Sequence, residues 1–251
     1  MFIYTWEGRT VIGTTDLDHK DNLDDEAVIT AEEVKYLLRA ANHEFPQAKL
    51  TPNDVIATFS GVRPIVSSGK GLDPSKERRD HAVWADKGVI SVSGGKLTTF
   101  RQIAQDVLTA AESWLPTIKQ RDQKASVFSK PEGHISSPLS PEQYRRFVGK
   151  YGYLAQRFLA EMPAQELKLI PETQTMWAEV RWALRYEQVV HLDDLMLRRT
   201  RLGLLLVKGG AAHFDTIKQI ALSEGWTEER WASEQARYSQ IWQAYYSLPK
   251  L

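Results

Sequence analysis

The sequence contains no cysteine. This absence excludes disulfide bonds, zinc sites built on thiolates, and catalysis by a cysteine nucleophile. A chain without cysteine fits a protein of the reducing cell interior, where disulfides are rare. We therefore expect a cytoplasmic location.

An excess of charge of either sign is also lacking, because 32 basic residues balance 32 acidic ones. The net charge thus gives no argument for binding to nucleic acid or to an anionic membrane. The basic stretch "LRRTR" (197–201) could contact nucleic acid, but no aromatic residues interleave with its basic ones. We expect no nucleic-acid partner.

Long hydrophobic runs are missing as well. The longest notable run in the C-terminal half is "LGLLLV" (202–207), far short of the roughly 20 residues that span a bilayer. The first ten residues, "MFIYTWEGRT", lack the basic start and apolar centre of a signal peptide. We expect neither a membrane-spanning helix nor a signal peptide.

The chain of 251 residues is long enough for one large domain or two ordinary ones. Residues 1–116 mix strand and helix patterns, which predicts an α+β or α/β domain with a mixed sheet and helices. Residues 117–140 are polar and contain several prolines, which predicts a linker. Residues 141–251 show only helical patterns, which predicts an all-α domain.

Local patterns predict the individual elements. The first part is expected to contain strands within residues 2–14, a helix over 30–45, a strand over 54–66 that is broken near Gly61 and Pro64, and a hairpin over 81–95. Thr30 and Glu33 can form a capping box at the start of the helix. Helical patterns follow at 97–114, 141–149, 151–162, 174–190, 192–206, 213–224 and 227–246. Five tryptophans are expected to anchor the packing of the last helices: Trp177, Trp182, Trp226, Trp231 and Trp242.

The stretch "SGGKLTTFR" (93–101) joins an apolar β-branched run to a helical pattern. Glycines let a ligand approach the backbone closely, and the start of a helix carries unpaired N–H groups and about half a positive charge. Lys96 adds a cation and Thr98 a hydroxyl. The turn therefore suits an anion, or a ring atom that becomes negative during a reaction. The alternative is a tight structural turn with a surface lysine.

A nucleotide triphosphate loop is excluded at this turn. That pattern requires a glycine five residues before the Gly-Lys pair, and a serine or threonine after the lysine. Here Ile90 and Leu97 occupy these positions.

Two other basic residues stand at breaks in the pattern. Arg63 lies in "SGVRP" (60–64) and Arg79 in "SKERRDH" (75–81). Together with Lys96 they could converge on a phosphate or carboxylate. Each of them taken singly is also explained as a solvated surface charge.

No metal site is expected. His191, Asp193 and Asp194 lie close together in the sequence, but an aspartate at that place is better explained as the cap of a helix. The nearby arginines, Arg198, Arg199 and Arg201, can pair with these acids or touch lipid headgroups.

Six stretches resemble the FAD-dependent, aerobic glycerol-3-phosphate dehydrogenases, in the order and at the spacing of that family. They are "IGTTD" (12–16), "TAEEVKYLL" (30–38), "DVIATFSGVRP" (54–64), "RDH" (79–81), "SGGKLTTFR" (93–101) and "DLMLRRTRLGL" (194–204). The resemblance implies that residues 1–116 are the C-terminal portion of the FAD-binding and substrate domain. Residues 141–251 would be the family's helical C-terminal domain.

The family's reaction is the oxidation of sn-glycerol 3-phosphate to dihydroxyacetone phosphate. The resemblance implies that a hydride passes from C2 of the substrate to N5 of the flavin, and that the electrons go on to quinone or, in related oxidases, to oxygen. It also leaves room for a peripheral contact with the inner face of the cytoplasmic membrane, and for a homodimer.

The resemblance assigns roles to residues of this chain. The cofactor would be bound by Gly94, Gly95, Lys96, Leu97 and Thr98. The substrate would be bound by Thr14, Arg63 and Arg79. The catalytic set would be Arg63, Arg79 and Lys96.

One feature of the family is missing. No part of the chain fits the dinucleotide fingerprint G-x-G-x-x-G. We expect this fingerprint and the candidate catalytic base to lie in an N-terminal half outside this chain. The isolated chain is then a fragment that binds FAD weakly and is inactive alone. The alternative is a non-catalytic remnant of such an enzyme, which binds an anion or another protein.

Overall fold

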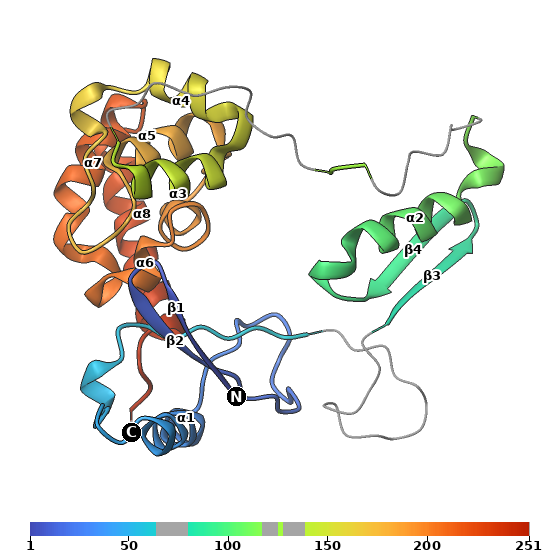
Figure 1. The fold of residues 1–251 in the computed structure, drawn as a ribbon, viewed down its shortest axis with the longest axis horizontal. Helices are drawn as coiled ribbons and strands as arrows, with labels where there is room; N and C mark the ends of the chain where they lie inside the picture. The colour runs from blue at the N-terminus through green and yellow to red at the C-terminus, as the bar shows by residue number, and fades with distance from the viewer. Residues whose placement is uncertain (64–79, 117–124, 128–138, 251) are drawn as a thin grey trace. The chain divides into compact units, whose positions relative to one another are not determined.

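The computed structural model describes residues 1–63, 80–116, 125–127 and 139–250 (Figure 1). The chain forms two compact units. One consists of residues 1–15, 26–60 and 128–251 and is called the helical unit here. The other consists of residues 16–25 and 61–127 and is called the hairpin unit. The predicted division at 117–140 stays a prediction, because most of that stretch lies outside the described residues.

The predicted mixed fold class is confirmed. Each described sheet is a pair of antiparallel strands, and the elements of regular structure in the described part of residues 141–251 are helices, apart from one isolated bridge between Leu169 and Met176. No helix in the described ranges is long and apolar enough to cross a membrane.

The N-terminal hairpin confirms the strands predicted within residues 2–14. Strand β1 (Phe2–Trp6) pairs with β2 (Arg9–Gly13), so that Trp6 lies opposite Arg9 and Phe2 opposite Gly13. Glu7 and Gly8 form the turn with φ of 48° and 78°. Two positive φ values in a two-residue turn match the right-handed twist of the strands, so this turn closes the hairpin without splaying it.

Helix α1 (Ala31–Glu44) begins with the predicted capping box. The Thr30 hydroxyl accepts from the Glu33 amide at 3.2 Å, and the Glu33 carboxylate accepts from the Thr30 amide at 2.9 Å. Val34 and Ala41 are buried on the apolar face. The helix ends before Pro46, as expected, and a short 3-10 turn follows at η1 (Pro52–Asp54).

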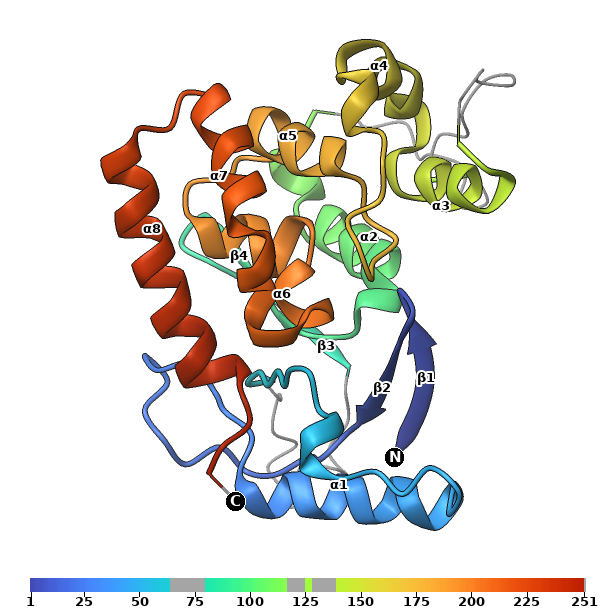
Figure 2. The same ribbon diagram turned by 90° about the vertical axis from the view of Figure 1, so that its left-hand side faces the viewer.

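The strand predicted over residues 54–66 is wrong within the described residues. Residues 55–63 are extended or irregular and belong to no sheet. Thr58 donates its amide to the Tyr246 carbonyl at 2.8 Å, and its hydroxyl donates to the Ser247 carbonyl at 3.2 Å. Figure 2 shows the C-terminal tail passing beside this segment. This β-branched segment therefore bonds to the C-terminal tail and not to another strand. Local propensity alone does not form a strand when no partner strand is present.

The helical pattern predicted after residue 140 is confirmed. The elements are α3 (Pro141–Tyr151), η4 (Gly152–Leu154), α4 (Ala155–Glu161), η5 (Ala164–Glu166), α5 (Trp177–Tyr186), η6 (Asp194–Arg199), α6 (Leu202–Leu205), η7 (Val207–His213), α7 (Phe214–Ser223), α8 (Glu228–Ile241) and η8 (Trp242–Tyr246). Ser140 caps α3 by accepting from the Gln143 amide at 3.3 Å, and Pro141 occupies the first helical position.

Two apolar clusters form the core of the helical unit. One gathers α5 to α8 around Leu195, Ile217 and Tyr238. The other is aromatic and places Phe158 against Trp182, with ring centroids 4.9 Å apart. Trp182, Trp226 and Trp231 are buried, and Trp177 and Trp242 pack partly buried against the first cluster. The expected role of the five tryptophans as packing anchors is confirmed.

Gly203 in α6 lies so close to its neighbours that a side chain does not fit. A Cβ at this position would come within 3.0 Å of both the Tyr238 hydroxyl and the Leu197 side chain. We expect Gly203→Ala to lower the free energy of unfolding by about 1–3 kcal/mol, the usual cost of overpacking a core. Urea unfolding measures this. Gly149→Ala in α3 is the control, because a Cβ there meets nothing within 4 Å. Equal stability of the two variants would contradict the tight packing.

Candidate functional site

The hairpin unit carries the turn singled out in the sequence. Strand β3 (His81–Asp86) pairs with β4 (Val89–Gly94), and Lys87 and Gly88 form the turn with φ of 48° and 80°. This confirms the hairpin predicted over 81–95. Helix α2 (Phe100–Ala110) lies along the hairpin (Figure 1), after the 3-10 turn η2 (Leu97–Thr99) and before η3 (Glu112–Trp114).

Two consecutive glycines turn the chain from β4 into the helix. Gly94 and Gly95 have φ of 78° and 85°, in the region that favours glycine. The backbone at Gly95 also passes close to its neighbours, since a Cβ there would lie 2.6 Å from the Ile103 side chain and 3.2 Å from His81. The sequence requires glycine here for both reasons.

The helix start is closed by a threonine in an unusual way. Thr99 holds the capping position of α2, but its side chain makes no capping bond to the helix. Instead its hydroxyl donates to the Lys96 carbonyl at 3.0 Å and accepts from the Lys96 amide at 3.4 Å. This closes a 3-10 turn that begins at Leu97. The first-turn N–H groups, which lack partners inside the helix, are therefore presented at Leu97 and Thr98.

A polar pair that sequence analysis missed ties the strand to the helix. His81 on β3 lies 2.7 Å from the Asp106 carboxylate on α2, and Gln102 donates to the same carboxylate at 2.8 Å. The two partners are 25 residues apart, so only the packing of α2 on the hairpin brings them together. Their contact ties the middle of α2 to the first residue of β3.

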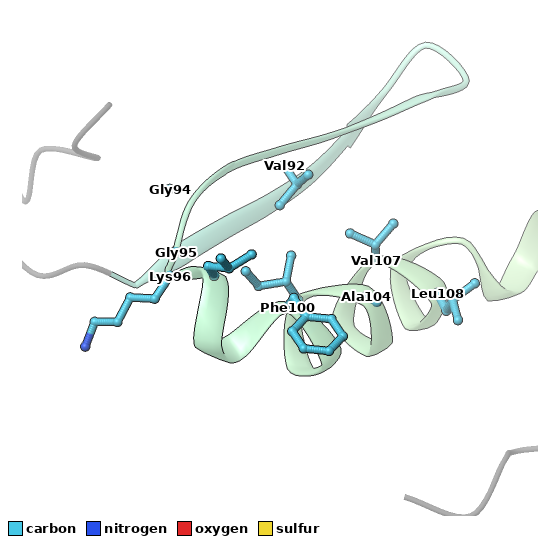
Figure 3. Close-up of a pocket in the computed structure, with 10 residues that line it drawn as sticks. Val92, Gly94, Gly95, Lys96, Phe100, Ala104, Val107 and Leu108 are labelled. Atoms are coloured by element: carbon cyan, nitrogen blue, oxygen red, sulfur yellow. The ribbon is translucent and has the colours of Figure 1, made fainter. Parts of the chain in front are cut away.

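An open apolar hollow of about 760 Å³ lies beside this turn (Figure 3). It is lined by Val92, Gly94, Gly95, Lys96, Leu97, Phe100, Ile103, Ala104, Val107 and Leu108. The Leu97 and Leu108 side chains are 89% and 51% exposed. The Lys96 side chain points away from the apolar side chains. The arrangement offers an apolar surface next to backbone N–H donors, which suits a flat ring with an electron-rich edge.

No feature of the sequence indicated this hollow. The helical spacing of apolar residues in 97–114 predicted a helix, and no residue of α2 is buried among the described residues. An apolar periodicity shows which side of a helix avoids water, and it does not show what covers that side.

The structure places the expected site residues in different parts of the chain. Gly94, Gly95, Lys96, Leu97 and Thr98 are contiguous on the turn. Arg63 lies in the hairpin unit, 3.6 Å from the Asp16 carboxylate. Thr14 belongs to the helical unit, where its exposed side chain follows β2 and donates to the Thr15 carbonyl at 2.8 Å. Arg79 lies outside the described residues. The convergence of Arg63, Arg79 and Lys96 therefore stays a prediction.

The acidic residues near 191–194 pair with basic partners. Asp193, whose side chain is 6% exposed, binds the guanidinium groups of Arg198 and Arg237. This confirms the expected pairing of Arg198 with the acids. The helix-capping bonds come from Asp194 instead of Asp193, because its carboxylate accepts the amides of Val190 and His191 at 3.1 and 2.9 Å. Asp193 does not cap the helix because its buried carboxylate is already bound to two arginines.

Replacing Gly95 tests the geometry of the turn. We expect Gly95→Ala to destabilise the hairpin unit by about 2 kcal/mol more than Gly88→Ala does, because Gly95, unlike Gly88, combines a positive φ with a clash. Gly88 has φ of 80° and open space around it, so its variant isolates the backbone term. Amide hydrogen exchange over residues 81–110 measures both. Indistinguishable exchange would show that Ile103 and His81 move aside freely.

Two family models match the chain, and together they cover residues 1–231. Residues 1–101 match the family model "FAD dependent oxidoreductase". Residues 90–231 match the family model "C-terminal domain of alpha-glycerophosphate oxidase". No solved structure matches the chain.

Several curated proteins are similar to the chain. A glycerol-3-phosphate dehydrogenase of Mycobacterium leprae is 30% identical over 95% of this chain and 43% of its own length. An aerobic glycerol-3-phosphate dehydrogenase of Bacillus subtilis is 32% identical over 80% of this chain and 40% of its own length. A mitochondrial glycerol-3-phosphate dehydrogenase of Mus musculus is 27% identical, over 92% and 34%. The chain therefore spans less than half the length of these relatives.

Proposed function

Because the chain belongs to the family described as the C-terminal domain of alpha-glycerophosphate oxidase, we propose that it is the C-terminal portion of a flavin-dependent dehydrogenase. The whole enzyme oxidises sn-glycerol 3-phosphate to dihydroxyacetone phosphate and passes the electrons to quinone. The observation that carries this proposal is the turn at Gly94–Thr98, which lies inside the stretch similar to FAD-dependent oxidoreductases. The names of the curated relatives support the choice of substrate.

The residues at the turn fit one end of FAD. Two left-handed glycines keep side chains away from the start of α2, so that a flat ring can approach the backbone N–H groups of the turn. When bound, FAD accepts the hydride released from C2 of the substrate. The amides of Leu97 and Thr98, the helix dipole and the Lys96 ammonium then stabilise the negative charge that arrives at the ring edge.

To bind the substrate phosphate, a cationic side chain must exchange its present acidic partner for the phosphate. Arg63 is half exposed and lies 3.6 Å from Asp16, whose side chain is 34% exposed. An exposed ion pair of this kind contributes about 0–1 kcal/mol. A phosphate dianion can therefore displace Asp16 and form charge-assisted bonds with the guanidinium group. We assign the other arginine, Arg79, to the oxygen at C2 of the substrate, and Thr14 to the substrate side of the site.

The remainder of the cofactor requires a second polypeptide portion. The sequence has no G-x-G-x-x-G to hold the pyrophosphate. The exposed side chains of Leu97 and Leu108 supply an apolar surface next to the turn. We propose that an FAD-binding N-terminal portion covers this surface and completes the site, and that the chain alone is inactive.

Reconstitution tests the proposal. The purified chain is mixed with FAD, glycerol 3-phosphate and a dye acceptor, with and without a separately expressed FAD-binding N-terminal half of a relative. We expect flavin absorbance and dye reduction only in the mixture, and transfer to a soluble quinone in place of the dye. Turnover by the chain alone, at the level of a complete relative, would overturn the requirement for a second portion. No flavin and no turnover in any mixture would favour a non-catalytic remnant.

The apolar surface has its own test in the same assay. We expect Leu108→Asp to weaken reconstitution at least about 10-fold, because a carboxylate would have to be buried at the contact. Val190→Asp is the control, since Val190 is 59% exposed and lies in the helical unit. Equal reconstitution by the two variants would show that the hollow is not covered.

A further inference from the structure

The N-terminal hairpin is too small to hold its own position. It consists of two strands of five residues each, and an isolated two-stranded hairpin is marginally stable in water. The side chains of Phe2 and Tyr4 are 48% and 49% exposed, so little apolar surface anchors β1. Contacts at the two ends of the hairpin must therefore decide where the strands lie.

The tip of the hairpin is bound by the C-terminal helices. The Arg146 guanidinium of α3 donates from Nε to both carboxylate oxygens of Glu7, at 3.1 and 3.0 Å. The same guanidinium donates to the buried Glu179 carboxylate of α5 at 2.8 Å. The bond to Glu179 holds the Arg146 guanidinium in place, so Glu7 binds a cation whose position is fixed by α5.

Two further contacts surround the tip. Arg9 donates to the Leu205 carbonyl at 2.9 Å and to the Glu172 carbonyl at 3.2 Å. Arg201 lies over the Trp6 ring, with its guanidinium carbon 5.5 Å from the centroid. The residues on both sides of the turn therefore bind elements that are distant in sequence, and Figure 1 shows the hairpin tip against the helices.

The other end of the hairpin leads directly to Thr14. Gly13, the last residue of β2, packs under the Phe2 ring, where a Cβ would lie 3.1 Å from the ring. Thr15 donates its hydroxyl to Glu33, the partner of Thr30 in the capping box of α1. Thr14 thus stands between a strand whose far end is fixed by Arg146 and a residue that is fixed by α1. A five-residue strand spans about 17 Å, so movement of the tip tilts the end that carries Thr14.

We propose that Arg146 and Glu7 are positioning residues, through which the C-terminal helices set the place of Thr14 in the substrate site. The role assigned to Thr14 rests on the proposed function. The positioning itself rests on the contacts at the tip. The C-terminal helices then contribute to substrate affinity without touching the substrate.

Hydrogen exchange on the purified chain tests the positioning. In Glu7→Ala the amides of residues 2–13 are expected to exchange about 10- to 100-fold faster, the effect of losing charge-assisted hydrogen bonds on local opening. The amides of α3 and α5 keep their protection, because Arg146 retains Glu179. Glu32→Ala is the control, since its ion pair with Lys35 is exposed and distant from the tip. Unchanged exchange in Glu7→Ala would overturn the proposal.

A second measurement separates positioning from general stability. In the reconstituted enzyme, Glu7→Ala is expected to raise KM for glycerol 3-phosphate about 10-fold at nearly unchanged kcat, the pattern of lost binding geometry. Glu7→Asp keeps the charge and should recover part of the affinity. An unchanged KM would overturn the positioning role. If the wild-type mixture shows no turnover, the proposed function fails, while the exchange measurement still decides whether Arg146 holds the hairpin.

Discussion

Glu179→Leu is expected to lower the free energy of unfolding of the helical unit by about 3–5 kcal/mol, the cost of breaking a buried ion pair from one side. The Glu179 side chain is fully buried. Its carboxylate accepts from Arg146 at 2.8 Å, from Lys150 at 2.7 Å, and from the Tyr151 hydroxyl at 3.1 Å. Leucine has a similar volume, so the loss comes from the two cations that remain without their shared partner.

The same carboxylate makes stability depend on pH. Burial raises the pKa of Glu179, but the charges of Lys150 and Arg146 outweigh burial and hold the pKa below its ordinary value of 4.5. A folded-state pKa below the unfolded one means that this contribution is complete above about pH 4.5 and is lost as the pH falls through the folded pKa. We expect the wild-type protein to lose stability in this acidic range, and the Glu179→Leu variant to lose less.

Urea unfolding at neutral and acidic pH measures both effects. Glu142→Leu, an exposed carboxylate in the first turn of α3, is a suitable control, because its side chain has water available in both states. A Glu179→Leu variant as stable as the wild-type protein at neutral pH would show that apolar packing replaces the network. Identical acid dependence in wild type and variant would show that other carboxylates dominate.

Lys96→Met is expected to lower kcat of the reconstituted enzyme by about 10²–10³, the usual loss when one group that stabilises developing charge is removed. Lys96 follows the two left-handed glycines and is exposed, so its ammonium is free of any buried structural role. Methionine keeps the length of the side chain and removes only the charge. The free energy of unfolding should therefore remain nearly unchanged.

Steady-state kinetics with a dye acceptor measures this effect, and flavin absorbance reports whether the cofactor is still bound. Lys87→Met is the matched control, because Lys87 lies at the opposite end of β4 in the hairpin turn. A Lys96→Met enzyme that retains both flavin and full kcat would remove Lys96 from the catalytic set. Loss of flavin with no change in kcat per bound flavin would assign Lys96 to cofactor binding alone.

Short-range features were predictable from the sequence because their causes are local. The capping box of α1 requires only Thr30 and Glu33, three residues apart. The hairpin turns at Glu7-Gly8 and Lys87-Gly88 require only a glycine at a position of positive φ. The glycine pair at 94–95 likewise indicated a turn with special backbone geometry. A family resemblance spread over six stretches added the site residues, most of which no local rule would have identified.

Long-range features were not predictable, and the segment at residues 54–63 shows why. Its β-branched residues indicated a strand, but a strand exists only if another strand pairs with it, and here the C-terminal tail takes that place. The apolar hollow beside α2 is a similar case, because periodicity reveals an apolar face and leaves its neighbour undetermined. The pairing of His81 with Asp106 depends on the packing of α2 on the hairpin.

By itself the sequence determined the mixed first part, the helical second part, the hairpin turns and the glycine turn before α2. Each of these follows from steric and hydrogen-bonding rules that act within a few residues. Only the tertiary structure decided that Glu179 is buried between Arg146 and Lys150, and that Glu7 binds a helix 139 residues away. A charged side chain is stable in a protein interior only when partners from distant segments reach it together, and that meeting is a property of the folded chain.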